Sequence, residues 1–112
     1  MIFVDYLGPA ARLTQVQTIV AREVGAAMRV SAEQVAVRRI VTDDNRDEIE
    51  VWIELSTDEQ LYRLGRVIAQ RISLALRPDH DGPAVWVMYR VVPLNHAFLN
   101  GEARGRGTAT LE

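Results

Sequence analysis

Two long stretches of helical period, each between strand-like segments, constrain most strongly what this chain can fold into. In the first, apolar residues recur at spacings of three and four: Leu13, Val16, Val20, Val24, Ala27 and Met28. In the second, Leu61, Leu64, Ile68, Ile72 and Leu76 repeat along one face. Ser56 and Glu59, just before this second stretch, have the spacing of a capping box. Each pattern predicts an amphipathic helix with one buried face.

The segments that flank these helices have the patterns of strands, at residues 2–7, 35–41, 49–55 and 84–92. The last is the most hydrophobic, which is typical of a central strand. The polar turn at residues 42–48 predicts a hairpin between the second and third strands. The element order is β-α-β twice, which predicts an α+β fold with a four-stranded mixed sheet and two helices on one face.

The rest of the chain adds little to this domain. We expect residues 1–103 to form a single domain and residues 104–112 a poorly ordered tail. Turn residues between Pro93 and Gly101 predict a last small strand or hairpin. Val, Trp and Met at alternate strand positions leave the second face of the sheet partly apolar, and exposed faces of this kind usually associate.

Charge and composition argue against several classes of function. The 112 residues carry a net charge of −2, which gives no electrostatic reason to expect nucleic acid or an anionic membrane as a partner. The sequence has no apolar run of roughly 20 residues and no signal-peptide pattern, so a cytoplasmic protein is expected. The chain has no cysteine, no metal-ligand spacing and no glycine-rich phosphate loop. We therefore expect no metal and no cofactor.

Three stretches resemble the tautomerase superfamily, which includes 4-oxalocrotonate tautomerase, macrophage migration inhibitory factor and 5-carboxymethyl-2-hydroxymuconate isomerase. Residues 11–37, ARLTQVQTIVAREVGAAMRVSAEQVAV, are similar to the family's first helix and second strand. Residues 48–76, EIEVWIELSTDEQLYRLGRVIAQRISLAL, resemble the strand and helix of its second half, and VVPLNHAFLNGE resembles a C-terminal strand and turn. The resemblance implies a homotrimer that buries the open sheet faces. It also implies keto–enol proton transfer on a small carboxylate-bearing substrate.

The family uses an N-terminal proline as its general base, whereas this chain begins with Met1 and Ile2. Lysine is absent, because all 13 basic residues are arginine, so no side chain offers an amine. The resemblance therefore assigns the role of base to the α-amino group of Met1, since groups of this kind ordinarily titrate near pH 8. A bulky second residue predicts that Met1 is retained.

The resemblance also implies a set of substrate contacts. Arg12 matches an arginine that relatives use to bind a substrate carboxylate, for which a planar guanidinium is suited. Relatives often carry a second arginine at the position of Ala36, and Arg38, two residues on, faces the same way and is expected to replace it. Tyr89 is a candidate hydrogen-bond donor to an enolate. His96 is a candidate contact to the site of a neighbouring subunit.

This hypothesis makes a geometric prediction. The guanidinium groups of Arg12 and Arg38 should lie within about 10 Å of the Met1 nitrogen, in one chain or across a subunit boundary. Arg90, in the most apolar strand, also needs a partner if it is buried. Glu50 or Glu54 across the sheet is one candidate, and an intersubunit salt bridge is the favoured interpretation. Two alternatives stay open: a non-catalytic binding or assembly module of the same fold, and a ferredoxin-like dimer with the same element order.

Overall fold

The computed structural model describes residues 1–44 and 46–103. Its strands and helices are β1 (Ile2–Leu7), η1 (Ala10–Arg12), α1 (Leu13–Met28), η2 (Ala32–Gln34), β2 (Val35–Arg39), β3 (Ile49–Leu55), α2 (Asp58–Leu76), β4 (Val85–Val91), η3 (Leu94–His96), β5 (Phe98–Leu99) and β6 (Glu102–Ala103), where η denotes a 3₁₀ helix. This order confirms two successive β-α-β units. No helix in these described residues is long and apolar enough to cross a membrane.

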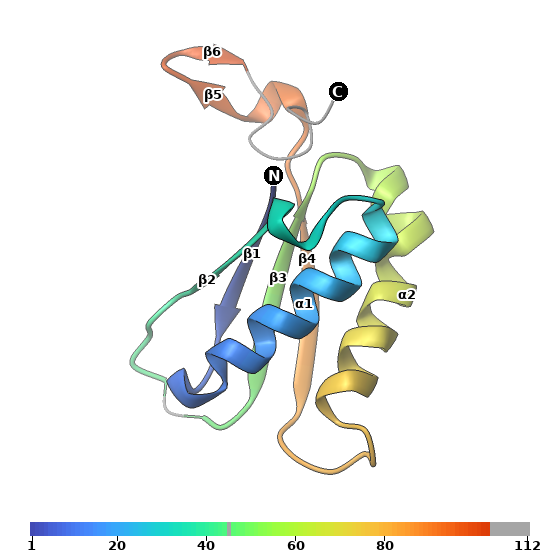
Figure 1. Ribbon diagram of the computed structural model, residues 1–112. Helices are drawn as coiled ribbons and strands as arrows, with labels where there is room; N and C mark the ends of the chain where they lie inside the picture. Colours follow the sequence, from blue (N-terminus) through green and yellow to red (C-terminus); the bar gives the residue numbers. More distant parts are fainter. Residues whose placement is uncertain (45, 104–112) are drawn as a thin grey trace.

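The four long strands form one mixed sheet in the order β2-β1-β3-β4. Within each unit the two strands are adjacent and parallel, and the units join through the antiparallel pair β1 and β3. Both helices cover the same face of the sheet (Figure 1). The predicted α+β class is confirmed, and the adjacency of strands within each unit differs from the split units of a ferredoxin-like sheet.

The predicted hairpin between β2 and β3 is wrong, because β1 lies between these two strands. A β-α-β crossover returns the chain beside its first strand and parallel to it, so α1 places β2 against β1. The connection to β3 then passes the end of β1, where the Ile40 N–H donates to the Tyr6 carbonyl at 2.8 Å. The polar segment 42–48 is therefore a link between two units.

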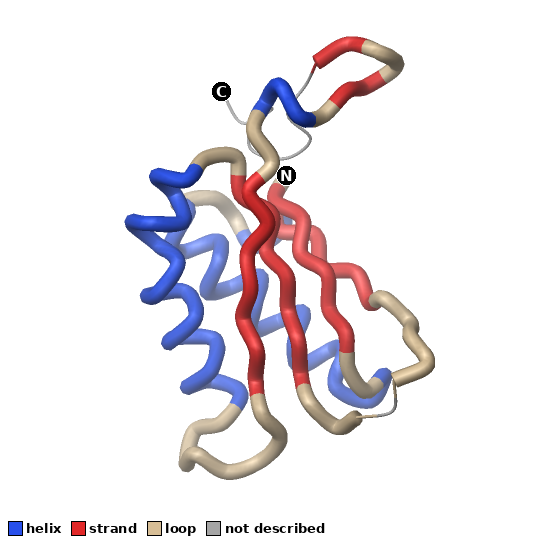
Figure 2. The backbone as a smooth tube through the Cα atoms, turned by 180° about the vertical axis from the view of Figure 1, so that it is seen from behind, coloured by secondary structure: helices blue, strands red, loops and turns tan. Residues whose placement is uncertain are grey.

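The hydrophobic core lies between the helices and the sheet face that they cover. Alternate strand residues point into it, and they are Ile2, Val4, Tyr6, Val35, Ile49, Val51, Ile53 and Leu55. The other face, which we call the open face, is left uncovered by the helices, as Figure 2 shows from behind. β4 is an edge strand and not the predicted central one. Its hydrophobic character comes partly from Trp86 and Met88 on the open face, where Trp86 is 53% exposed.

The helix α2 begins one residue later than predicted. Thr57, and not Ser56, is its N-cap, with the Thr57 hydroxyl accepting from the Gln60 N–H at 3.1 Å. The Gln60 side chain accepts in return from the backbone N–H groups of Thr57 and Ser56. The capping box is therefore Thr57 with Gln60, in which a threonine hydroxyl and a glutamine side chain take the two roles expected of Ser56 and Glu59.

The chain after β4 forms an arm, residues 93–103, that stands clear of the two layers (Figure 1). Val92 still donates to the Leu55 carbonyl at 2.8 Å, and η3 follows. β5 and β6 pair through Phe98 with Ala103 and Leu99 with Glu102, which confirms the predicted small hairpin. Asn100 and Gly101 make its turn with positive φ angles. The expectation of a disordered tail at 104–112 lies outside the described residues.

Candidate functional site

Met1 lies at one end of a central strand of the sheet. β1 begins at Ile2, and the antiparallel register that pairs Val4 with Ile53 brings this end beside the end of β3 and the start of α2. The arm leaves the sheet at the same end, because Val92 is bonded to Leu55. The α-amino group is thus held at a fixed place in the fold, at the root of the arm (Figure 1).

Two guanidinium groups lie at the opposite end of β1. Arg12 ends η1, is half-buried, and donates to the Gln15 side chain at 3.3 Å. Arg39 donates to the Gly8 carbonyl at 3.0 Å. Among the described residues, neither forms an ion pair with a carboxylate. Burial raises the pKa of Tyr6, and the positive charges of Arg39 and Arg12 lower it part of the way back. The same end of β1 also carries carboxylates, because Asp44 and Asp47 line the depression that includes Arg39.

The predicted meeting of Met1 and Arg12 does not occur within one chain. The six residues of β1 extend about 20 Å and separate the two groups. The expectation that both lie within about 10 Å can therefore hold only across a subunit boundary, where the start of one copy's β1 meets the end of another's. That version stays a prediction.

Arg38 is bonded to Asp5 on the open face. Its Nε donates to Asp5 Oδ1 at 2.5 Å, and Arg90 Nη1 donates to Oδ2 at 2.8 Å. Burial alone would raise the pKa of Asp5, but the hydrogen bonds and charges of both arginines outweigh burial and lower that pKa. Arg90 also lies over the Trp52 ring. The structure gives Arg90 a partner in Asp5, which the sequence analysis did not name, and the intersubunit salt bridge stays a prediction.

Tyr89 and His96 lie apart from this cluster. The Tyr89 hydroxyl donates to the Gly65 carbonyl at 2.6 Å on the helix side of the sheet, and burial raises its pKa to about 12. This donor is engaged in holding β4 to α2. His96 ends η3 on the arm and is exposed.

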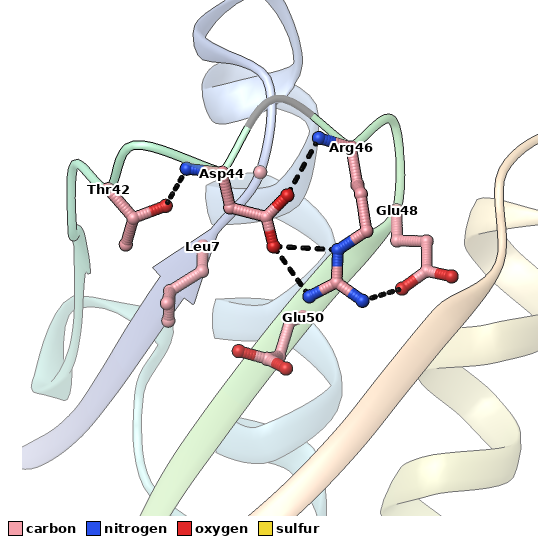
Figure 3. Close-up of a pocket in the computed structure, with 7 residues that line it drawn as sticks. Leu7, Thr42, Asp44, Arg46, Glu48 and Glu50 are labelled. Carbon is pink, nitrogen blue, oxygen red and sulfur yellow. Dashed lines mark hydrogen bonds and ion pairs between the residues drawn. The ribbon is translucent and has the colours of Figure 1, made fainter.

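Figure 3 shows a hollow at the end of β1, under the link between the two units. Its lining residues are Leu7, Gly8, Thr42, Asp44, Arg46, Glu48 and Glu50. Arg46 is paired with Asp44 at 2.6 Å and with Glu48 at 3.6 Å, so its charge is already compensated. The hollow has a volume of about 40 Å³, which suits one or two water molecules and no carboxylate substrate.

A neighbouring depression of about 210 Å³ includes Arg39 in its lining. It is smaller than ligand sites ordinarily are, which begin near 300 Å³. Within the described residues, no group of three or more His, Asp or Glu side chains is placed to hold a metal ion. A single chain therefore has amine and guanidinium groups at two ends of β1 without an enclosed pocket that joins them.

Asp5 and Arg39 were not among the residues that the sequence analysis selected. Asp5 is the one buried charged residue in the described part of the chain. Its signal was present in the sequence, since a carboxylate in the middle of the apolar strand IFVDYL requires a partner. Arg39 gave no such signal, because its bond to the Gly8 carbonyl depends on the register of β1 and β2.

Comparison with known proteins found no matching family model and no matching curated protein. Solved structures do match. A macrophage migration inhibitory factor-like protein from Entamoeba histolytica has a TM-score of 0.65 at 6% identity, with 90% of this chain and 96% of that chain covered. A fused 4-OT, solved as an asymmetric trimer, has a TM-score of 0.63 at 15% identity, with 90% and 94% covered.

A member of the cis-3-chloroacrylic acid dehalogenase family also matches. It has a TM-score of 0.55 at 17% identity, with 94% of this chain and 85% of that chain covered. At these identities the likeness concerns the fold. These matches agree with the β-α-β units, the mixed sheet and the one-sided helices described above, and on this basis the chain has the fold of the tautomerase superfamily.

Proposed function

We propose that this protein catalyses keto–enol proton transfer on a small carboxylate-bearing substrate, as a homotrimer with the α-amino group of Met1 as its general base. The observation that carries the proposal is the fixed position of this amine at the start of a central strand in a tautomerase fold. The amine takes the proton of the enol oxygen, the carbonyl forms, and the resulting ammonium returns a proton to the substrate carbon.

The carboxylate-binding role in this proposal belongs to Arg12 of a neighbouring copy. Arg12 pairs with no described carboxylate, and a cation at the start of a helix is unfavourable next to the positive end of the helix dipole. A bound carboxylate would remove this repulsion and accept two parallel hydrogen bonds. Arg38 keeps its bond to Asp5 and offers its remaining N–H groups, and the exposed His96 extends on the arm towards a neighbour.

A second candidate is a non-catalytic binding or assembly module of the same fold. The observation that favours it is the engagement of Arg38 with Asp5, which reduces its capacity to bind a substrate. Tyr89 is likewise engaged with Gly65 and enters neither proposal as a substrate contact.

The test is the ketonisation of phenylenolpyruvate, followed by ultraviolet absorbance, on untagged protein whose N-terminal residue is verified by mass spectrometry. Activity that disappears when the α-amine is acetylated supports the proposed base. The variant Ile2→Pro is measured in parallel, with its N-terminus also verified. If the native chain is inactive and the proline variant is active, the chain has a tautomerase pocket without its chemistry and the proposed role of Met1 is rejected. Inactivity of both chains favours the assembly-module candidate.

A further inference from the structure

The side of α2 that faces away from the sheet has a local excess of positive charge. Residues 60–77 contain four arginines and no aspartate or glutamate, although the whole chain has a net charge of −2. α2 packs on the sheet with its opposite side (Figure 1). We call the solvent-facing side the outer surface of α2, and its residues are Arg63, Arg66, Val67, Arg71, Leu74 and the C-cap Arg77.

Nearby carboxylates compensate only part of this charge. Oε1 of Glu59 lies 3.6 Å from Nε of Arg63, but both side chains are largely exposed, so this pair contributes little. Oε1 of Glu23, on α1, lies 3.8 Å from Nη1 of Arg71, while its other oxygen is 3.0 Å from a second arginine. Among the described residues, Arg66 forms no ion pair. The outer surface of α2 therefore keeps a net positive charge.

Arg77 lies at the edge of a depression where α2 ends. The depression has a volume of about 300 Å³, and its lining residues are Gln70, Ser73, Leu74, Arg77 and His80. Nη2 of Arg77 donates to the His80 carbonyl at 2.8 Å, whereas its Nε is buried without an acceptor among the described residues. Arg77 therefore keeps hydrogen-bonding capacity beside a space large enough for a bulky side chain.

Aliphatic side chains lie between the arginines. Val67 is 44% and Leu74 60% exposed, and their spacing of seven residues places them on the same side of the helix. Leu74 also lines the depression. Protein interfaces are enriched in arginine, and their binding energy is concentrated in side chains that fill a pocket inside a polar rim. The outer surface of α2 has both features.

The surrounding charges limit the kind of partner that fits. Asp58 and Glu59 precede the outer surface of α2, and Asp79 and Asp81 follow it, so the positive stretch is about 20 Å long. A nucleic acid or an anionic membrane extends beyond this length and would meet these carboxylates. A second copy of the same surface would bring four further arginines. A short acidic segment of another protein meets neither obstacle.

We infer that the outer surface of α2 binds a short acidic segment of another protein. One apolar side chain of that segment enters the depression beside Leu74, and its carboxylates pair with the surrounding arginines. α2 lies on the side of the sheet opposite to the open face (Figure 1). The inference therefore depends neither on the proposed catalysis nor on the proposed homotrimer.

The probe is a synthetic, fluorescently labelled peptide of about 12 residues, which spans about 18 Å as a helix. It has one central phenylalanine with glutamates on both sides, and its binding to the full chain is measured by fluorescence anisotropy. We expect saturable binding that weakens as the salt concentration rises. A peptide with glutamine in place of glutamate should bind about tenfold more weakly or worse, since it forms no charge-assisted bonds. A peptide with serine in place of the phenylalanine should also bind more weakly, because it lacks the apolar anchor.

Variants of the chain locate the binding surface. Arg66→Gln should weaken peptide binding about tenfold, whereas Arg29→Gln, which removes an exposed arginine at the end of α1, should leave it unchanged. Leu74→Ser should weaken binding as well, and Val41→Ser is its control, since Val41 is 76% exposed on a distant segment. Gln70→Glu, which adds a negative charge beside the depression, provides an independent variant if one of these fails to fold.

Three results would each overturn the inference. The first is the absence of measurable peptide binding by the native chain. The second is equal binding of the glutamate and glutamine peptides, or equal effects of the variants and their controls. The third is binding of duplex DNA or of phosphatidylserine vesicles that is as tight as that of the peptide and equally sensitive to Arg66→Gln. These readouts stand whether or not the enol assay shows activity.

Discussion

The guanidinium carbon of Arg90 lies 4.6 Å from the centre of the Trp52 ring, and the same guanidinium donates to Asp5. The ring of Trp52 therefore lies beside the cluster that Asp5 forms with Arg38 and Arg90. We predict that Arg90 and Trp52 are energetically coupled by about 0.5–1 kcal/mol, the range for cation–π pairs at partly exposed sites. A double-mutant cycle with Arg90→Gln and Trp52→Leu in urea unfolding measures this coupling. Strict additivity of the two single variants would contradict it.

Replacing Asp5→Asn should lower the free energy of unfolding at pH 7 by about 1–3 kcal/mol, because two arginines lose their shared carboxylate. The pKa of Asp5 is lowered in the fold, so its stabilising contribution is present above the unfolded pKa near 4 and is lost as the pH falls through the folded value. The acid limb of the stability curve should therefore flatten in this variant. Asp79→Asn, in an exposed loop, is the control and should leave the curve unchanged.

The N-cap of α2 is Thr57 and not Ser56, so the contributions of these two neighbouring residues to stability can be compared directly. Thr57→Ala removes the hydroxyl that caps Gln60 and should cost about 1 kcal/mol of stability. Ser56→Ala should cost much less, because Ser56 takes part through its backbone N–H. Thermal unfolding of both variants measures the difference, and a larger loss for Ser56→Ala would restore the capping box expected from the sequence.

Tyr89 should make the fold sensitive to alkali. Burial raises its pKa to about 12, whereas an unfolded tyrosine titrates near 10. Between these values the unfolded chain loses a proton that the folded chain keeps, so stability should fall as the pH rises from about 10 to about 12. Tyr89→Phe should be about 1 kcal/mol less stable at pH 7, through loss of the bond to Gly65, and less steep in this window. Urea unfolding at pH 9 and pH 11 provides the measurement.

For the proposed chemistry, Arg12→Gln should raise the KM for an enol carboxylate about tenfold or more, since a charge-assisted pair contributes roughly 1.5–3 kcal/mol. The variant Arg63→Gln on α2, where Arg63 is exposed, is the matched control. Equal kinetic constants for both variants would remove Arg12 from the site.

The sequence predicted the helices and strands better than it predicted which strands and side chains lie next to one another. Periodicity placed both helices and all four long strands, because burial of one face imposes a period of its own on each element. The neighbour of β2 depends on the crossover through α1, and the polar turn beside it suggested the wrong pairing. The partner of Arg90 was missed for a similar reason. Asp5 lies 85 positions away in the chain, and only the sheet order brings the two together.

For the candidate site, too, the sequence showed some properties of the residues and not others. The sequence showed which side chains have suitable chemistry, but not which of them are available to contact a substrate. Arg38 and Tyr89 were selected for their chemistry, and the structure engages one with Asp5 and the other with Gly65. Such engagement depends on contacts between distant segments, which a local pattern does not contain.

Because β1 pairs with β2 on one edge and with β3 on the other, the first half of the chain leaves the ribosome with one row of backbone donors and acceptors of β1 still unpaired. That row finds its partner only after residues 49–55 have been synthesised. Until then the first half of the chain has an unpaired strand edge, which can form hydrogen bonds with an extended segment of another chain. The length of the polar link at residues 42–48 therefore adds to the time between the synthesis of β1 and that of β3. Lengthening this link should prolong the interval in which the partly synthesised chain can aggregate.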